Sequence, residues 1–298
     1  MRKVFLVVIF LPCWCAAQVG SFAPQVGEFG STAIHKDDDR FRDWAISCQV
    51  IRGLQQIDLA DSGYASSGSE LYATGKADAP LTLSLGDGGQ ATLTFSGRIF
   101  DGIGPDFAVF ENGFGSGVET FLEFAFVEVS SDGIHFFRFP AVSEIQDSIQ
   151  KETFENTDAS LVKTLAGKYT VNYGVPFDLA DLPDTSALDK GNVSHVRIID
   201  VVGVLDSNYA TIDANGKKIN DPWPTNFPQS GFDLDAVGII NSTIPVGIKE
   251  LRSDLEKTER DFRCFDLSGR VIPCSSLNTG LYIQSGELKW NLTNDTKE

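Results

Sequence analysis

Carboxylates crowd one apolar stretch of the chain, residues 101–139, which reads DGIGPDFAVFENGFGSGVETFLEFAFVEVSSDGIHFFRF. Arg138 is the cation that this stretch itself supplies. A carboxylate buried among aromatic side chains without a partner costs on the order of several kcal/mol. The acids must therefore lie at a solvent-exposed edge of the fold, pair with cations from elsewhere in the chain, or hold a metal ion. They are Asp101, Asp106, Glu111, Glu119, Glu123, Glu128 and Asp132.

Calcium is the metal that such oxygen donors favour, because Ca²⁺ takes about 6–8 oxygen ligands from carboxylates, amides and carbonyls. Three short motifs supply such donors. In DGIGPD, turn residues separate two acids, and in FENG an acid and an amide lie at the end of a predicted strand. In DLD, two carboxylates lie two residues apart, on one face of a predicted strand. The alternative is that these acids cap turns or lie in solvent. The candidate calcium ligands are Asp101, Asp106, Glu111, Asn112, Asp233 and Asp235.

Catalytic signatures are missing from the sequence. It has no GxSxG, no HExxH and no glycine-rich phosphate loop that leads from a strand into a helix. The three histidines lie far apart and no CxxC accompanies them, which disfavours zinc. The sequence therefore predicts a protein that is not an enzyme. The alternative is a carbohydrate-active enzyme that uses two carboxylates among Glu111, Glu128 and Asp233.

Aromatic residues recur in segments that we predict to be long loops. Aromatic side chains on loops held by a rigid scaffold form a recognition surface for flat or ring-shaped ligands. The alternative is that these rings pin the loops to the scaffold. The sequence thus favours a non-catalytic binding protein, and the candidate ligand contacts are Tyr64, Phe114, Tyr209, Trp223 and Phe227.

Short runs of alternating or wholly apolar residues predict the strands that must position these side chains. Residues 86–89 turn between the first two runs and predict a hairpin, while 141–190 and 206–230 predict long loops. The predicted fold class is all-β, a jelly-roll-like antiparallel β-sandwich with long loops plus a small C-terminal β domain. The predicted strands are 81–85, 91–95, 107–111, 121–131, 134–139, 195–205 and 232–241.

The two ends of the chain differ in composition from its middle. Residues 1–17 carry two basic residues, an apolar run and a small-residue cleavage site, which predict a secretory signal peptide. A lipoprotein acylated at Cys13 or Cys15 is the alternative. The predicted domains are the signal peptide at 1–17, the β-sandwich at 18–243, a charged linker at 244–261 and the small β domain at 262–298.

The chain is acidic, with a formal net charge of −17. Such a charge disfavours nucleic acid and anionic membrane surfaces as partners. No stretch beyond the predicted signal is long and apolar enough to span a bilayer. In an oxidising compartment Cys264 and Cys274, which flank a predicted hairpin, could form a disulfide, and Cys48 is then left as a small buried residue.

Several long sequence blocks, in order over residues 31–241, resemble a family of bacterial cell-surface proteins with a jelly-roll-like β-sandwich. The blocks include DGIGPDFAVFENGF, FAFVEVSSDGIHFFRFP, HVRIIDVVG and SGFDLDAVGIIN. The tail, with CFDLSGRVI and NTGLYIQSGELKW, is similar to the C-terminal sorting domain of the type IX secretion system of Bacteroidetes. Its last strand departs from that pattern, because ELKWNLTNDTKE ends polar and acidic instead of basic and apolar.

The resemblance implies an exported protein, extracellular or on the outer-membrane surface, that captures a small molecule or a glycan without catalysis. Relatives of the sandwich occur in loci with TonB-dependent transporters, including loci for cobalamin uptake. An accessory role in nutrient uptake is therefore implied, with a corrinoid or glycan as ligand and the transporter and type IX machinery as partners. A structural calcium ion is a further expectation, and a calcium-stabilised adhesin or matrix protein is the other alternative.

Overall fold

Alternation of apolar and polar side chains builds the central strands of the protein. β4 (Gln90–Ile99) buries every second residue, so Leu93 and Phe95 face the core while Thr92 and Thr94 face outward. The computed structural model describes residues 20–79 and 81–243, and the backbone of four short strands between 264 and 292. The predicted signal peptide and linker lie outside the described residues.

Loops and short 3-10 turns connect the other strands of this part of the chain. The 3-10 turns are η1 (Ala60–Ser62), η2 (Glu70–Ala73), η3 (Ala159–Leu161) and η4 (Leu179–Asp181). The strands are β1 (Ile34–His35), β2 (Asp43–Ile51), β3 (Leu83–Ser84), β5 (Phe107–Glu111), β6 (Glu119–Thr120), β7 (Ala125–Ser130), β8 (Phe137–Arg138), β9 (Val142–Ser143), β10 (Thr157–Asp158), β11 (Val162–Lys163), β12 (Tyr173–Phe177), β13 (Val193–Asp200) and β14 (Asp233–Ile239).

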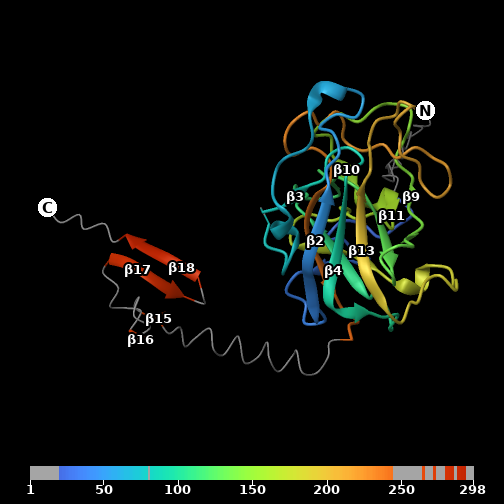
Figure 1. Ribbon diagram of the computed structural model, residues 1–298. Helices are drawn as coiled ribbons and strands as arrows, with labels where there is room; N and C mark the ends of the chain where they lie inside the picture. Colours follow the sequence, from blue (N-terminus) through green and yellow to red (C-terminus); the bar gives the residue numbers. More distant parts are fainter. Residues whose placement is uncertain are drawn as a thin grey trace, which may run out of the picture. The chain divides into compact units, whose positions relative to one another are not determined.

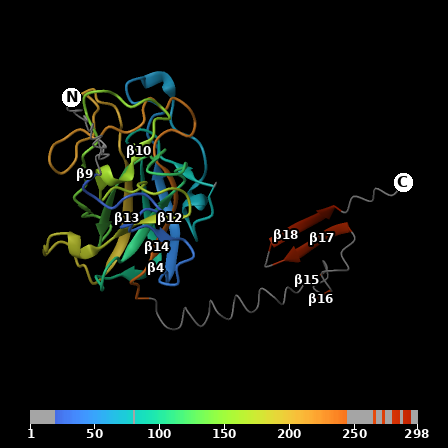
Figure 2. The same ribbon diagram turned by 180° about the vertical axis from the view of Figure 1, so that it is seen from behind.

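One large antiparallel sheet curls around the core in the order β1-β12-β5-β14-β2-β4-β13-β7-β8, with β3 paired to β14. Its two halves meet where β14 pairs with β2 over two positions, Gly238↔Trp44 and Ile239↔Asp43. β2, β4 and β13 are labelled in the view of Figure 1, and β12 and β14 in the reverse view of Figure 2. The fold is therefore all-β and consistent with a jelly-roll-like β-sandwich, which confirms the predicted fold class.

Aromatic side chains from both halves of the sheet form the centre of the core. Phe107 on β5 stacks on Phe177 at the end of β12, with ring centroids 5.3 Å apart. Phe139, which follows β8 in the other half, meets the Phe177 ring edge-on at 5.1 Å. All three side chains are fully buried, so they join the two halves of the sheet through one apolar contact.

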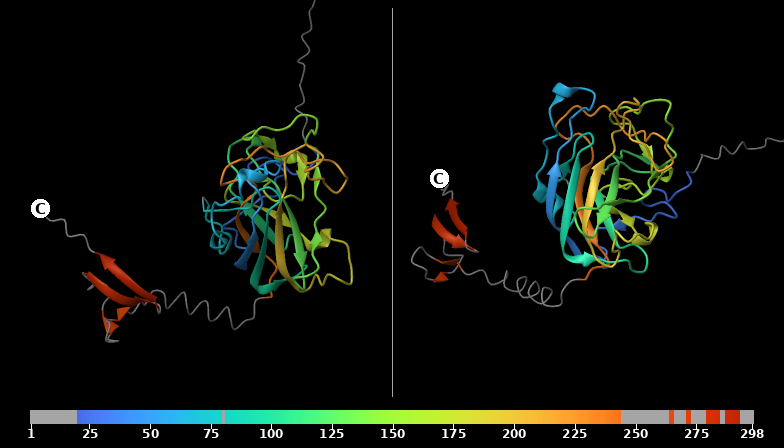
Figure 3. Two further views of the ribbon diagram at one scale, coloured as in Figure 1. Left: turned by 45° about the horizontal axis from the view of Figure 1, so that its top comes forward. Right: turned by 45° about the vertical axis from the view of Figure 1, so that its right-hand side comes forward.

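The two ends of the sandwich carry different groups of acids. One end of the sandwich, which we call the loop end, is uppermost in Figure 1 and tilted forward in the left view of Figure 3. The strands that end there are β5 and β13, and those that begin there are β4, β7 and β14. At the opposite end, which we call the linker end, β4, β12 and β14 end and β5 begins. Acids that follow or precede these strands therefore separate into two groups.

The predicted hairpin between 81–85 and 91–95 does not form. β3 pairs with β14 in one half of the sheet, whereas β4 lies between β2 and β13 in the other. Leu83 and Leu85 are both buried, and so is Ser84 between them, so this segment has no solvent face. The glycine turn exists, but it carries the chain from one half of the sheet to the other.

The C-terminal unit is a small four-stranded antiparallel sheet. The chain divides into two compact units after Thr243. The second unit orders its strands β16 (Val271–Ile272), β15 (Cys264–Phe265), β17 (Thr279–Gln284) and β18 (Glu287–Leu292). The predicted Cys264–Cys274 disulfide lies outside the residues whose side chains are described. Within the described residues, no helix is long and apolar enough to cross a membrane.

Candidate binding site at the loop end

Six buried acids gather at the loop end, and we call them the loop-end acids. Each lies at or next to a strand terminus or in the long loop 206–230 that rises above the sheet. Their exposed fractions run from 1% for Glu111 to 7% for Glu123 and Asp233. They are Asp87, Glu111, Glu123, Asp200, Asp221 and Asp233.

Three of the loop-end acids accept two hydrogen bonds each from described residues. Asp200 accepts from the backbone N–H groups of Phe232 at 2.7 Å and Gly88 at 2.9 Å. Asp233 accepts from the Ser84 hydroxyl and from the Asn112 amide at 3.0 Å. Asp87 Oδ2 accepts from the backbone N–H of Ile57 at 2.9 Å and from the Trp223 indole at 3.1 Å. Such donors hold the loops to the sheet.

The other three acids are short of donors. Glu111 Oε2 accepts from the Gly113 backbone at 2.6 Å, but the buried Oε1 has no hydrogen-bond partner among the described residues. Asp221 Oδ2 accepts from the Phe124 backbone at 2.9 Å, and its buried Oδ1 likewise has none. No described residue donates a hydrogen bond to the Glu123 carboxylate. A buried carboxylate oxygen without a donor is costly, so this group needs an explanation.

Burial and mutual repulsion raise the pKa values of these three carboxyls well above their usual range. Burial is the largest cause for each of them. For Glu123 the neighbouring negative charges of Asp233, Glu111 and Asp221 add to it. Lys151 lowers the pKa of Asp221 but does not offset the burial. The three carboxyls therefore interact electrostatically within one low-dielectric region.

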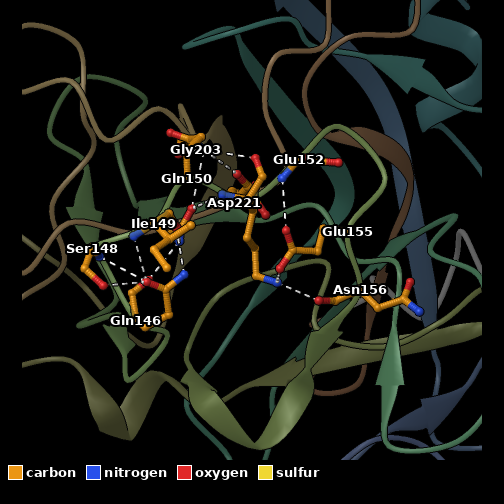
Figure 4. A network of polar contacts seen from close by, with 11 residues as sticks. Gln146, Ser148, Ile149, Gln150, Glu152, Glu155, Asn156, Gly203 and Asp221 are labelled. Atoms are coloured by element: carbon orange, nitrogen blue, oxygen red, sulfur yellow. Dashed lines mark hydrogen bonds and ion pairs between the residues drawn. The ribbon is translucent and has the colours of Figure 1, made fainter.

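A polar network holds Asp221 and the segment 146–156 in place (Figure 4). The Asn220 amide donates to the backbone carbonyls of Gln146 and Ile149, both at 2.8 Å, and its oxygen accepts from the Lys151 backbone at 3.0 Å. The Lys151 ammonium donates to Glu155 at 3.2 Å and to the Asn156 carbonyl at 2.5 Å. The main chain on both sides of Asp221 is thereby fixed without use of its carboxylate.

A row of phenylalanine rings lies on loops at the same end, and we call it the aromatic row. Phe114 stacks on Phe121 at 4.7 Å, Phe121 meets Phe154 at 5.7 Å, and Phe154 stacks on Phe227 at 6.0 Å. Phe121 is buried, but Phe114 and Phe154 are 55% and 65% exposed. Three separate loops therefore contribute to one row, in which Phe114 and Phe154 face solvent.

The aromatic row and the loop-end acids share one piece of chain. The segment 111–123 begins with Glu111 and ends with Glu123, and it carries Phe114 and Phe121 between them. The backbones of Phe114 and Phe121 exchange hydrogen bonds at 3.2 and 2.9 Å. A side chain at position 113 would meet Glu111 Oε2 at 2.9 Å and the Phe121 carbonyl at 3.0 Å, so the glycine there leaves room for the carboxylate.

The predicted ligand contacts have different surroundings. Phe114 and Phe227 belong to the aromatic row. Trp223 is partly buried and uses its indole N–H to hold Asp87. Tyr64, on another loop, and Tyr209, near the start of the loop 206–230, are exposed and have no ring contact with the row among the described residues. The sequence prediction missed Phe154, because the polar run KETFENT around it shows no strand or core pattern.

The six predicted calcium ligands do not form one site. Asp101 and Asp106 lie at the linker end, where their oxygens and one of Asp178 come within 4.8 Å of one another. Asp106 has donors for both oxygens, from Gly102 and Asn241 at 2.8 Å and from Leu179 at 2.7 Å. Asp106 is therefore explained as a hydrogen-bonded cap on the turn, and Asp178 accepts from the Ala180 N–H at the start of η4.

The remaining predicted ligands lie elsewhere. Glu111, Asn112 and Asp233 are at the loop end, where Asn112 donates to Asp233. Asp235 accepts from the Asp78 backbone at 3.0 Å, while its Oδ2 is buried without a partner among the described residues. Burial raises the pKa of Asp235 to about 6.

Glu128, predicted as one acid of a catalytic pair, is held within β7, between β13 and β8. Arg138 contacts its Oε1 at 2.8 Å and Arg197 contacts its Oε2. Register pairs Glu128 with Arg197 of β13 on one side and with Arg138 of β8 on the other. The structure does not bring this carboxylate to the loop end.

A cavity of about 630 Å³ lies beside β1 and β12. Apolar side chains such as Ile34 and Val175 line it together with Tyr169, Lys168 and Asp178. None of the loop-end acids or rings of the aromatic row borders it.

Comparisons with protein-family models, with curated proteins and with solved structures gave no match to this chain. The fold and the loop end define a β-sandwich protein that displays aromatic rings above a group of buried acids. Function is therefore inferred from this geometry and from the sequence resemblance.

Proposed function

We propose that this chain is an exported, non-catalytic binding protein that takes its ligand on the aromatic row. The observation that carries the proposal is the exposure of Phe114 and Phe154, each of which already stacks on one neighbouring ring of the row. Large apolar rings held in place at the surface lose little conformational freedom when a ligand covers them. Burying a ring of this size contributes about 1.5–3 kcal/mol.

A ring-shaped ligand with an apolar face suits this row best. A pyranose ring presents C–H groups on one face, and a corrinoid presents a broad planar macrocycle. Both can lie against aromatic rings that are spaced about 5–6 Å apart, as stacked rings prefer. Capture of a glycan or corrinoid for a TonB-dependent transporter at the cell surface is the role that the sequence resemblance supports.

Calorimetric titration of the purified chain with cobalamin, cobinamide and a glycan panel tests the proposal. We expect one class to bind, and Phe114→Ala and Phe154→Ala each to weaken that binding by about tenfold, or about 1.4 kcal/mol. Ile103→Ala is the matched control, because Ile103 is fully exposed at the linker end. Binding by neither class, or equal loss in Ile103→Ala, would overturn the proposal.

A further inference from the structure

The loop end holds more negative charge than its donors satisfy. Glu111 Oε1 and Asp221 Oδ1 are buried without a partner, and Glu123 receives no hydrogen bond from a described residue. Carboxylates in such a place must either take up protons or share a cation. Protonation removes the charge but supplies no donor for the buried oxygens of Glu111 and Asp221, whereas a cation satisfies both requirements.

We propose that Glu111, Glu123 and Asp221 bind a calcium-class cation between the segment 111–123 and the loop that carries Asp221. All three are hard oxygen donors, and three carboxylates suit a divalent ion that accepts many oxygens in flexible geometry. Magnesium is disfavoured, because it needs a near-ideal octahedron of closer ligands and keeps its waters.

The supporting backbone is already in position for such an ion. Glu111 and Asp221 each use one oxygen on a backbone N–H, which orients the carboxylate and leaves its second oxygen for a ligand. The Lys151 ammonium, which lowers the pKa of Asp221, is engaged by Glu155 and Asn156. It therefore does not replace the cation.

The linker-end acids provide a contrast. Asp101, Asp106 and Asp178 form the one group of three among the described residues whose oxygens lie within 4.8 Å of one another, yet Asp106 is fully supplied with donors. The loop-end carboxylates stand further apart than that limit. Glu111 and Asp221 are held by backbone N–H groups, so binding requires the Glu123 carboxylate, which accepts no hydrogen bond from a described residue, to move toward them.

The proposed ion would also stiffen the aromatic row. It ties the segment with Phe114 and Phe121 to the loop that runs from Asp221 to Phe227, and Asn220 ties that loop to the segment with Phe154. Dependence of ligand affinity on calcium therefore rests on the proposed function. Binding of the ion itself does not, and it is measured without any ligand.

Titration of the metal-stripped full chain with Ca²⁺ and with Tb³⁺ tests the site. We expect the melting temperature of the sandwich to rise by about 5–10 °C at a calcium concentration a hundredfold above Kd. We also expect Tb³⁺ luminescence excited through tryptophan, since the Trp223 indole contacts the loop-end acid Asp87. Absence of both effects, or an equal response to Mg²⁺, would overturn the assignment.

Three isosteric variants locate the ion. Glu111→Gln, Glu123→Gln and Asp221→Asn are each expected to weaken calcium binding at least tenfold. They should also raise the melting temperature of the metal-free chain, because each removes one charge from a repelling group. Asp178→Asn, at the linker end, is the control and should leave calcium binding at the wild-type strength.

Two outcomes contradict the proposal. If the variants stabilise the chain but wild type shows no response to calcium, the loop-end acids are a protonated group. If Asp178→Asn abolishes the calcium response, the ion belongs to the linker end. Should a variant fail to fold, the anomalous signal of Tb³⁺ in a crystal of the wild-type chain places the ion at one end or the other.

Discussion

At the residue scale, Lys168 is an amine kept inside the protein with one strong acceptor. It is 4% exposed, lines the cavity beside β12, and donates to the Val162 carbonyl at 2.6 Å. Burial lowers the pKa of Lys168 from 10.5 to about 8, and the distant charge of Asp158 opposes that change only in part. The folded chain therefore releases this proton at a lower pH than the unfolded chain does.

This difference predicts how stability changes with pH. Between the folded and unfolded pKa values the unfolded chain binds more protons, so the free energy of unfolding rises with pH. Relative to Lys168→Met, we expect wild type to gain about 2 kcal/mol between about pH 7 and pH 9.5. Chemical denaturation at both pH values measures this gain. Lys163→Met, at an exposed lysine of the same cavity, should keep the wild-type slope.

At the element scale, charged and aromatic side chains join β8, β7 and β13 across the outer face of the sheet. Glu128 on β7 accepts from Arg138 at 2.9 Å and from Arg197 at 2.8 Å. The Arg138 guanidinium lies 4.2 Å from the Phe126 ring centroid, and that of Arg197 lies 3.8 Å from Phe136. The carboxylate is buried while the guanidinium groups remain partly exposed. Loss of a partner therefore destabilises the fold more when it leaves the carboxylate unpaired than when it leaves a guanidinium unpaired.

Glu128→Gln is therefore expected to destabilise the sandwich by about 1–3 kcal/mol, because the amide nitrogen of Gln cannot accept from an arginine and both guanidinium groups lose their counter-charge. Arg138→Met should cost less, since Arg197 still neutralises Glu128. The midpoint and slope of urea denaturation measure both effects. Equal stability of Glu128→Gln and wild type would show that the three side chains contribute nothing as a group.

The same strands show what the sequence could predict at this scale. β5 was predicted with the bounds that it has, because its run FAVFE is apolar on both faces. The segment around Leu83 was assigned to a hairpin, since nothing in its alternation reveals that Ser84 is buried against Asp233 of β14. Local pattern identifies strands, but pairing across the sandwich depends on contacts distant in sequence.

At the scale of the whole molecule, the loop-end site was predictable in part. Glu111 and Asp233 were candidate ligands because they flank predicted strands, and register pairs Glu111 with Leu234, the neighbour of Asp233. Glu123 was noted as an acid among aromatics and then assigned to a central strand, although it precedes β7. Asp221 lies in a loop whose course is set by Asn220 and Gln150, so no local signal marked it.

The division after Thr243 predicts where the chain can be shortened. Thr243 still belongs to the sandwich, because its N–H donates to the Arg98 carbonyl at 2.8 Å and its hydroxyl accepts from the Arg98 N–H at 3.1 Å. Asn241 donates its amide to Asp106 at 2.8 Å and accepts from the Phe100 backbone. A chain that ends at Thr243 should therefore keep every contact that the described sandwich makes.

We expect that shortened chain to melt cooperatively, within about 1 °C of the main transition of the full chain, since each unit is compact by itself. A chain that ends at Ile239 loses the hydrogen bonds of Asn241 and Thr243 and leaves the buried Asp106 short of a donor. Its melting temperature should fall by about 5–10 °C. Scanning calorimetry of the full chain and the two shortened chains measures these melting temperatures. Loss of cooperative melting on cutting at Thr243 would mean that the C-terminal unit is needed for the sandwich to fold.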